Sequence, residues 1–457
     1  MDAKLNAIIE SMRDEMIDTL QKWIRVPSVK GEAAPGAPFG REVRGMLDMA
    51  LADCEQMGLQ TQNFDGYIAH ADLGEGSDED ALAILAHLDV VPEGDGWQYP
   101  PYGAVIENGR VYGRGASDDK GPAVAALYAM KAVKDAGIPL RRKVRLILGC
   151  DEESGWEDIE HYNRVAVMPR MGFSPDASYP IINIEKGICR LELHGGLSRE
   201  GLQVIAFNNG ERPNVIPGRA SALIAGDAAT AALAEAAAGR LDIPAEVRLT
   251  DGGVSITVTG VSGHAAYPET ARNANGEMLL LLRELGVQGD LRLLADRIGL
   301  DYRGEGLEIS VSDGISGYLT CNLGIIRAGE GGVYATLDIR YPVMTNPDMI
   351  IKNVSASLPG MRVEAMEVKE PHHVPAGSEL VQKLLDAYHE VTGYERRCLY
   401  TGGGTYARSL REGVAFGASF PQDEDLAHQA NEYADLEGLY KNVKIFALAI
   451  VKLAGRA

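Results

Sequence analysis

Residues 81–91 (ALAILAHLDVV) form a short, almost wholly apolar run. The run is too short and too uniformly apolar for a surface helix, so we predict a buried strand of a mainly parallel sheet. Similar runs at 144–149 and 181–184 predict further strands, and Pro122 predicts the start of a helix between the first two. Strands that alternate with helices indicate an α/β sandwich.

The pattern changes after about residue 188. Short strands with few helices predict an inserted α+β domain over 189–375, with enough segments for two ferredoxin-like units. One expected hairpin joins 318–327 to 333–342 around a glycine-rich turn. The flanking segments, 1–188 and 376–457, are then the two parts of one α/β domain. Near its N-terminus, apolar residues recur at helical spacing over positions 5 to 24, which predicts a helix.

Composition restricts the partners and the compartment. The chain has 44 Lys+Arg against 65 Asp+Glu and a formal net charge of −21, so phosphate backbones and anionic membranes are poor partners. The five cysteines are dispersed and form no CxxC pair. This usage indicates reduced thiols in a cytoplasmic protein rather than a disulfide framework or a thiolate zinc site.

Acidic residues and one histidine gather where the predicted strands end, which is where α/β sheets bind ligands. They are His87, Asp89, Asp118, Asp119, Asp151, Glu152, Glu153 and Asp176. Each cluster alone could be a solvated acidic loop, and His87 with Asp89 a satisfied core pair. Together, unpaired carboxylates would repel one another and be costly to bury. A divalent metal removes that conflict.

Imidazole and carboxylate ligands without a thiolate suit zinc, or a similar metal such as manganese or cobalt. At least four carboxylates exceed the ligands of one catalytic zinc, so we predict two metal ions. In the tandem pair Glu152 and Glu153, one side chain can bind metal while its neighbour acts as a base.

Six motifs in order along the chain match a known family: 87–89 (HLD), 115–122 (GASDDKGP), 151–156 (DEESGW), 174–176 (SPD), 260–264 (GVSGH) and 427–432 (AHQANE). On these motifs the chain resembles the co-catalytic zinc metallopeptidases of the aminoacylase and carboxypeptidase G type. It is most similar to their carnosinase-like bacterial dipeptidases, the dipeptidase V branch. The resemblance implies a zinc-peptidase α/β catalytic domain with an inserted α+β lid.

The resemblance also implies a ligand set. His87 and Asp176 would hold one metal, Glu153 and His428 the other, and Asp119 would bridge them. A cis peptide is expected between Asp118 and Asp119.

Catalytic roles follow from the same resemblance. Glu152 would be the general base and then the acid toward the leaving amine, while Asp89 would orient His87. His264 would stabilise the oxyanion of the tetrahedral intermediate, although a loop histidine is more often only a surface residue.

Substrate-binding residues are implied in the lid and the second part of the catalytic domain. Asn214 matches a lid residue that faces the substrate. Arg340 and the turn Gly402, Gly403 and Gly404 match a site for the substrate carboxylate, which a guanidinium and free backbone N–H groups suit. Arg340 could instead pair only with Asp338 or another neighbour.

We therefore expect a metal-dependent dipeptidase acting on short peptides with a free C-terminal carboxylate. The alternative function is that of an N-acyl-amino-acid amidohydrolase with the same site. A remote alternative is a non-catalytic, metal-bound protein that binds peptides. The long insertion and the loop at 92–97 favour the dipeptidase. A doubled insertion would also let His264 act within its own chain, so that one chain holds a complete active site.

Overall fold

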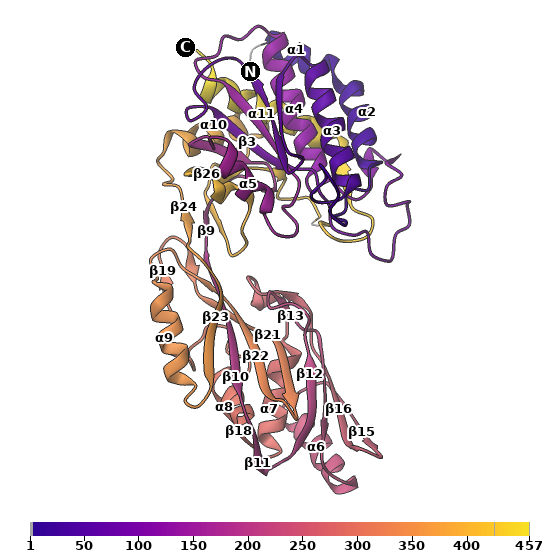
Figure 1. Cartoon of the computed structure of the whole chain (residues 1–457), viewed down its shortest axis with the longest axis vertical. Coiled ribbons are helices and arrows are strands. Elements are labelled where there is room, and N and C mark those ends of the chain that lie inside the picture. Colours follow the sequence, from indigo (N-terminus) through magenta and orange to yellow (C-terminus); the bar gives the residue numbers. More distant parts are fainter. Residues whose placement is uncertain (1–2, 425, 457) are drawn as a thin grey trace. The chain divides into compact units, whose positions relative to one another are not determined.

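The computed structural model describes residues 3–424 and 426–456. The chain forms two compact units, each with its own sheet (Figure 1). The first unit comprises Met1–Asn183, Val374–Leu399 and Gly404–Ala457, and the second comprises Ile184–His373 and Tyr400–Gly403. Within the described residues no helix has the length and apolar character needed to cross a membrane.

The largest sheet has the strand order β1-β2-β6-β3-β7-β26-β9-β24, with β25 also on β9. Its central strands β6, β3, β7 and β26 are mutually parallel, and two of them, β3 and β6, are strands that the apolar runs predict. The third predicted strand, β9, pairs antiparallel with β26. All residues of β3 and β6 are buried, which explains their uniform apolar composition. The strands are β1 (Gln60–Phe64), β2 (Ile68–Leu73), β3 (Leu82–His87), β6 (Val144–Gly149), β7 (Met171–Ser174), β9 (Ile182–Glu185), β24 (His372–His373), β25 (Leu399–Thr401) and β26 (Glu412–Ala415).

Seven α-helices accompany this sheet among the described residues. They are α1 (Ala3–Ser11), α2 (Arg13–Ile24), α3 (Arg41–Gln56), α4 (Lys120–Asp135), α5 (Glu157–Val165), α10 (Glu379–Thr392) and α11 (Leu436–Ala454). The alanine-rich α4 is almost wholly buried and packs against α11, because small side chains allow close approach. The predicted N-terminal helix is divided at Met12 into α1 and α2.

Short strands bring the segment before α11 next to the loop that precedes α4. A three-stranded sheet joins β4 (Val105–Glu107), β5 (Arg110–Tyr112) and β28 (Tyr433–Asp435). The pair β8 (Ala177–Ser178) and β27 (Ala418–Ser419) and the 3₁₀ helix η2 (Tyr406–Ser409) complete the first unit.

The second unit contains one antiparallel sheet of eight strands in the order β15-β16-β14-β12-β21-β22-β10-β23. The predicted hairpin is confirmed, because β21 pairs with β22 and Gly329 lies opposite Gly332. The strands are β10 (Gly187–Gly195), β12 (Val204–Asn209), β14 (Arg219–Ile224), β15 (Ala245–Thr250), β16 (Gly253–Thr259), β21 (Thr320–Gly329), β22 (Gly332–Tyr341) and β23 (Arg362–Lys369).

Helices and short pairs complete this unit, whose hydrophobic core is separate from that of the first. The helices are α6 (Ala228–Arg240), α7 (Ala274–Glu284), α8 (Asp290–Arg297), α9 (Pro347–Ser357) and the 3₁₀ helix η1 (Pro268–Thr270). The short pairs are β11 (Leu197–Gly201) with β18 (Val287–Gly289), β13 (Val215–Ile216) with β17 (Gly263–His264), and β19 (Ser312–Asp313) with β20 (Gly317–Tyr318).

Candidate active site

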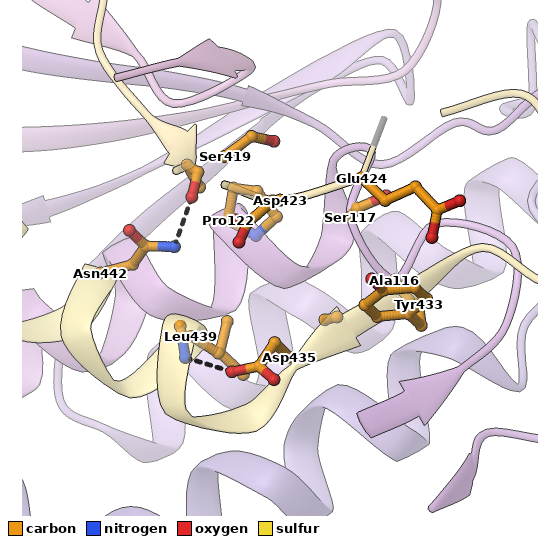
Figure 2. Close-up of a pocket in the computed structure, with 13 residues that line it drawn as sticks. Ala116, Ser117, Pro122, Ser419, Asp423, Glu424, Tyr433, Asp435, Leu439 and Asn442 are labelled. Atoms are coloured by element: carbon orange, nitrogen blue, oxygen red, sulfur yellow. Dashed lines mark hydrogen bonds between the residues drawn. The ribbon is translucent and has the colours of Figure 1, made fainter. Parts of the chain in front are cut away.

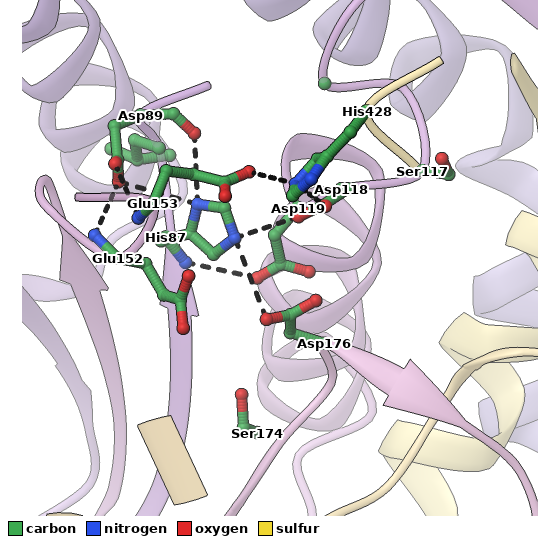
Figure 3. Close-up of polar contacts among 12 residues, drawn as sticks. His87, Asp89, Ser117, Asp118, Asp119, Glu152, Glu153, Ser174, Asp176 and His428 are labelled. Carbon is green, nitrogen blue, oxygen red and sulfur yellow. Dashed lines mark hydrogen bonds and ion pairs between the residues drawn. The ribbon is translucent and has the colours of Figure 1, made fainter. Parts of the chain in front are cut away.

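His87 is the last residue of β3 and points its imidazole at a group of carboxylates (Figure 3). Its Nδ1 lies 3.0 Å from the main-chain oxygen of Asp89 and 3.5 Å from the Asp89 carboxylate. Because a carbonyl oxygen only accepts, Nδ1 carries a proton. Burial opposes the charged imidazole, but hydrogen bonds to Asp118 and Asp89 raise the pKa of His87 well above its usual value, so that Nε2 also carries a proton. Nε2 lies 3.0 Å from Asp118 Oδ1 and 3.8 Å from Asp176 Oδ2.

Asp118 lies between two groups of potential metal ligands. One group is His87, Asp118 and Asp176, and the other is Asp118, Glu153 and His428; within each, the ligand atoms lie within 4.8 Å of one another. Asp118 Oδ2 is 3.2 Å from His428 Nε2, which is also 2.8 Å from Glu153 Oε1. The two groups share the carboxylate of Asp118, which could therefore bridge two metal ions.

Asp119, which the resemblance assigns as the bridge, has a different environment. Its Oδ2 accepts a hydrogen bond from the main-chain N–H of His87 at 3.1 Å, and its buried Oδ1 has no hydrogen-bond partner among the described residues. The peptide bond between Asp118 and Asp119 is cis, as expected. The structure thus places Asp118, and not Asp119, between the two imidazoles.

The carboxylate of Asp89 holds the turn that carries the tandem glutamates. It accepts the N–H groups of Glu152 at 3.2 Å and Glu153 at 3.1 Å. Glu153 then reaches His428, whereas the Glu152 carboxylate makes no hydrogen bond or ion pair with any described residue. Burial raises the pKa of Glu152 well above its usual value, against the charge of His87, and the charges of Asp176 and Glu153 raise it further.

The crowding of these groups shifts their pKa values. Burial and then Asp118 raise the pKa of Asp176 to about 7. Hydrogen bonds to Asp118 and Glu153 raise the pKa of His428 to about 10. Burial opposes ionisation of Asp118, but hydrogen bonds from His428 and His87 lower its pKa. Imidazole nitrogens and carboxylate oxygens that crowd together in this way fit divalent metal ions.

Two buried carboxylates that sequence reasoning did not assign hold the ligand loops. Glu432 is fully buried and accepts from Arg114 Nη1 (2.7 Å), from the N–H groups of Gly115 (3.2 Å), Ser117 (2.9 Å) and Asp118 (3.2 Å), and from Ser117 Oγ (3.1 Å). Asp158 accepts the N–H groups of Cys150 at 2.7 Å and Asp151 at 3.1 Å. The position of Glu432 in the motif at 427–432 was the available signal for its role.

Cavities of the first unit lie beside the ligand groups. Asp118 and Asp176 line one of them, together with Ser117, Ser419 and Phe420. A neighbouring cavity is lined by Ser117, Ser419, Tyr433 and Asn442 among others (Figure 2). Two of the ligand carboxylates, those of Asp118 and Asp176, therefore border a cavity.

The second unit gathers the residues expected to bind substrate. Val215 and His264 pair between β13 and β17, and Ala265 N–H donates to the oxygen of Asn214 at 2.9 Å. His264 Nδ1 accepts the N–H of Ala266 at 3.2 Å, so Nε2 carries the proton. Burial, followed by the charge of Arg340, lowers the pKa of His264 and favours this neutral form.

Arg340 is buried, and it pairs with more than Asp338. Its Nη1 donates to the carbonyl oxygen of Gly402 at 2.6 Å. Gly403 N–H donates to Thr401 Oγ1 at 2.9 Å and so is not free, contrary to the expected open turn. A side chain at Gly402 would lie 2.6 Å from Ala266 Cβ, which explains the glycine there. Gly404 belongs to the first unit.

The model of peptidase family M20/M25/M40 matches residues 83–452, which include every ligand and catalytic candidate above. The chain belongs to this family. This M20 peptidase is 40% identical over 459 residues to "Putative dipeptidase YtjP" of Bacillus subtilis (strain 168), covering 97% of the chain and 98% of the relative. It is 33% identical over 466 residues to "Beta-Ala-Xaa dipeptidase" of Lactobacillus delbrueckii subsp. lactis, covering 99% of each.

Solved structures agree on the fold. The crystal structure of human carnosine dipeptidase 1 matches with a TM-score of 0.59 at 17% identity, over 99% of each chain. The peptidase reading and the α/β fold with an inserted domain are thereby confirmed.

Proposed function

We propose that this M20 peptidase is a metal-dependent dipeptidase that cleaves short peptides with a free C-terminal carboxylate. The observation that carries the proposal is the position of Glu152, a half-buried carboxylate that pairs with no described residue and lies next to two ligand groups that share Asp118. The names of the Bacillus and Lactobacillus relatives, which match over nearly the whole chain, support the dipeptidase over the acylase.

Two divalent ions are proposed, with zinc the preferred metal and manganese or cobalt as alternatives. His87 and Asp176 would hold one ion, Glu153 and His428 the other, and Asp118 both. When bound, the ions would supply Lewis-acid polarisation of the scissile carbonyl and lower the pKa of the attacking water.

The chain's own residues then move the protons. Glu152 takes a proton from the attacking water as the new C–O bond forms. It later gives a proton to the leaving nitrogen as the C–N bond breaks, so that two amino acids are released from a dipeptide. His264, with its proton on Nε2, is the donor that we assign to the oxyanion.

The second unit supplies substrate recognition in this proposal. Arg340 would bind the C-terminal carboxylate beside the turn of Gly402 and Gly403. Asn214 would face the scissile peptide, and Gly404 would end the turn. All of these residues come from one chain. The five cysteines form no disulfide, which supports the cytoplasmic location that we also propose.

A substrate panel tests the proposal. Metal-free protein is reconstituted with zinc, manganese or cobalt and assayed on Ala-Ala and on N-acetyl-alanine. We expect release of alanine from the dipeptide at a kcat/KM well above that for the acyl amino acid. Faster turnover of N-acetyl-alanine would establish the amidohydrolase instead, and no turnover with any metal would contradict catalysis.

A further inference from the structure

We propose that Asp338 is a positioning residue that fixes the guanidinium of Arg340 for the substrate carboxylate. This inference rests on the proposed function, in which Arg340 binds that carboxylate. Asp338 and Arg340 are both residues of β22, and both are buried. Two residues apart on a strand, they lie on the same face of the sheet.

Asp338 holds one edge of the guanidinium with both of its oxygens. Oδ1 accepts from Arg340 Nε at 2.5 Å, and Oδ2 accepts from Arg340 Nη2 at 3.1 Å. Such a two-point contact fixes the plane of the guanidinium as well as its position. The third contact, from Nη1 to the oxygen of Gly402, ties the same group to the glycine turn.

These contacts leave a defined set of donors. A guanidinium has five N–H groups, and the described residues accept three of those of Arg340. One N–H on Nη1 and one on Nη2 remain, which is the number that a carboxylate accepts in a two-point contact. Asp338 therefore decides which N–H groups of Arg340 a substrate can use.

Carboxylates offset most of the positive charge of this cluster before a substrate arrives. Asp338 also accepts from Arg190 Nε at 2.8 Å, and Arg190 contacts Glu367, which also pairs with Lys369. Two carboxylates thus face three cations, and the long-range attraction for a substrate carboxylate is weak. Recognition then depends on how the free N–H groups are oriented.

The test compares Ala-Ala with its amide, which lacks the C-terminal carboxylate. Asp338→Asn should raise KM for Ala-Ala about tenfold or more, with kcat within about threefold, and should change KM for the amide much less. Glu367→Gln is the matched control, because it removes a carboxylate from Arg190 without touching Arg340. It should leave both substrates within about twofold. Thermal unfolding checks that each variant folds.

Further variants separate the outcomes. Asp338→Glu keeps the charge but moves it by one methylene, so it should show the same carboxylate-dependent rise in KM even if Asp338→Asn does not fold. Arg340→Met should lose the preference for Ala-Ala over the amide. If it does not, the proposed carboxylate site is wrong. If Arg340→Met does lose this preference, the two Asp338 variants decide the inference. When both leave KM unchanged, or raise it equally for Ala-Ala and its amide, Asp338 is not a positioning residue.

Discussion

Asp118 and Asp119 are adjacent, but their carboxylates face different partners. Asp118 lies between His87 and His428, whereas Asp119 accepts a main-chain N–H. Asp118→Asn should lower the content of both metals, because an amide replaces the shared carboxylate. Asp119→Asn should retain both, since an amide oxygen can still accept from His87. Elemental analysis of the two purified variants measures this, and equal losses would contradict the assignment of Asp118.

Metal affinity should rise with pH, because the metal must displace protons. The pKa of His428 is raised to about 10 and that of Asp176 to about 7. Against the effect of burial, hydrogen bonds to Asp118 and Asp89 also raise the pKa of the proposed ligand His87. At least three groups therefore release protons when metal binds below pH 7, and affinity should rise steeply with pH there. Above pH 7 the rise should be less steep, because Asp176 is then mostly ionised. Calorimetric titration of metal-free protein, in buffers of different ionisation enthalpy, counts the protons. An affinity independent of pH would show that these groups are not ligands.

At the residue scale, the ligand types could be predicted from the sequence, because imidazole and clustered carboxylates at strand ends have few other stable uses. The choice between Asp118 and Asp119 could not. It depends on how Glu432 and the N–H of His87 orient the loop, and these are contacts between distant parts of the chain.

Glu432 joins the segment that carries His428 to the loop that carries Asp118. It comes just before β28 and accepts five hydrogen bonds from residues 114–118. Glu432→Gln should weaken metal binding by about 10–100-fold, because an amide cannot accept from all of these donors. Excess metal should restore much of the activity.

Glu437→Gln is the control for this prediction, since Glu437 is an exposed residue of α11 that pairs with Arg13. Its metal affinity should match that of the unmodified protein. Unchanged affinity in Glu432→Gln would limit Glu432 to a role in folding.

Elements with an unambiguous apolar pattern could be predicted well. The strand at 144–149 coincides with β6, and the hairpin of β21 and β22 has the expected turn. The stripe at positions 5 to 24 predicts one helix, but the structure has α1 and α2. The apolar repeat reports which side is buried and does not detect a break at a single residue such as Met12.

For the whole molecule, the alternation of strands and helices predicts an α/β sheet, and the change after residue 188 predicts the inserted domain. The strand order of the eight-stranded sheet could not be predicted, because β12 pairs with β21 across more than 100 residues. Such pairing depends on contacts that local sequence patterns do not encode.

The proposal that one chain holds a complete active site predicts no complementation between subunits. His264→Ala and Glu152→Ala should each be inactive, and they should stay inactive when mixed under conditions that allow subunit exchange. A site shared between two subunits would instead become intact in a mixed dimer. Recovered activity on mixing would thus contradict the single-chain proposal.

The most direct test of the account is metal content and turnover measured together on Glu152→Gln. Glu152 is assigned as the base and not as a ligand, so the variant should keep two metal equivalents per chain. Its turnover should fall by about 10²–10⁴-fold, the usual contribution of a general base. Glu153→Gln is the matched variant and should lose metal, since Glu153 contacts His428. Full metal occupancy in Glu152→Gln, with turnover within about threefold of the unmodified protein, would contradict the central claim.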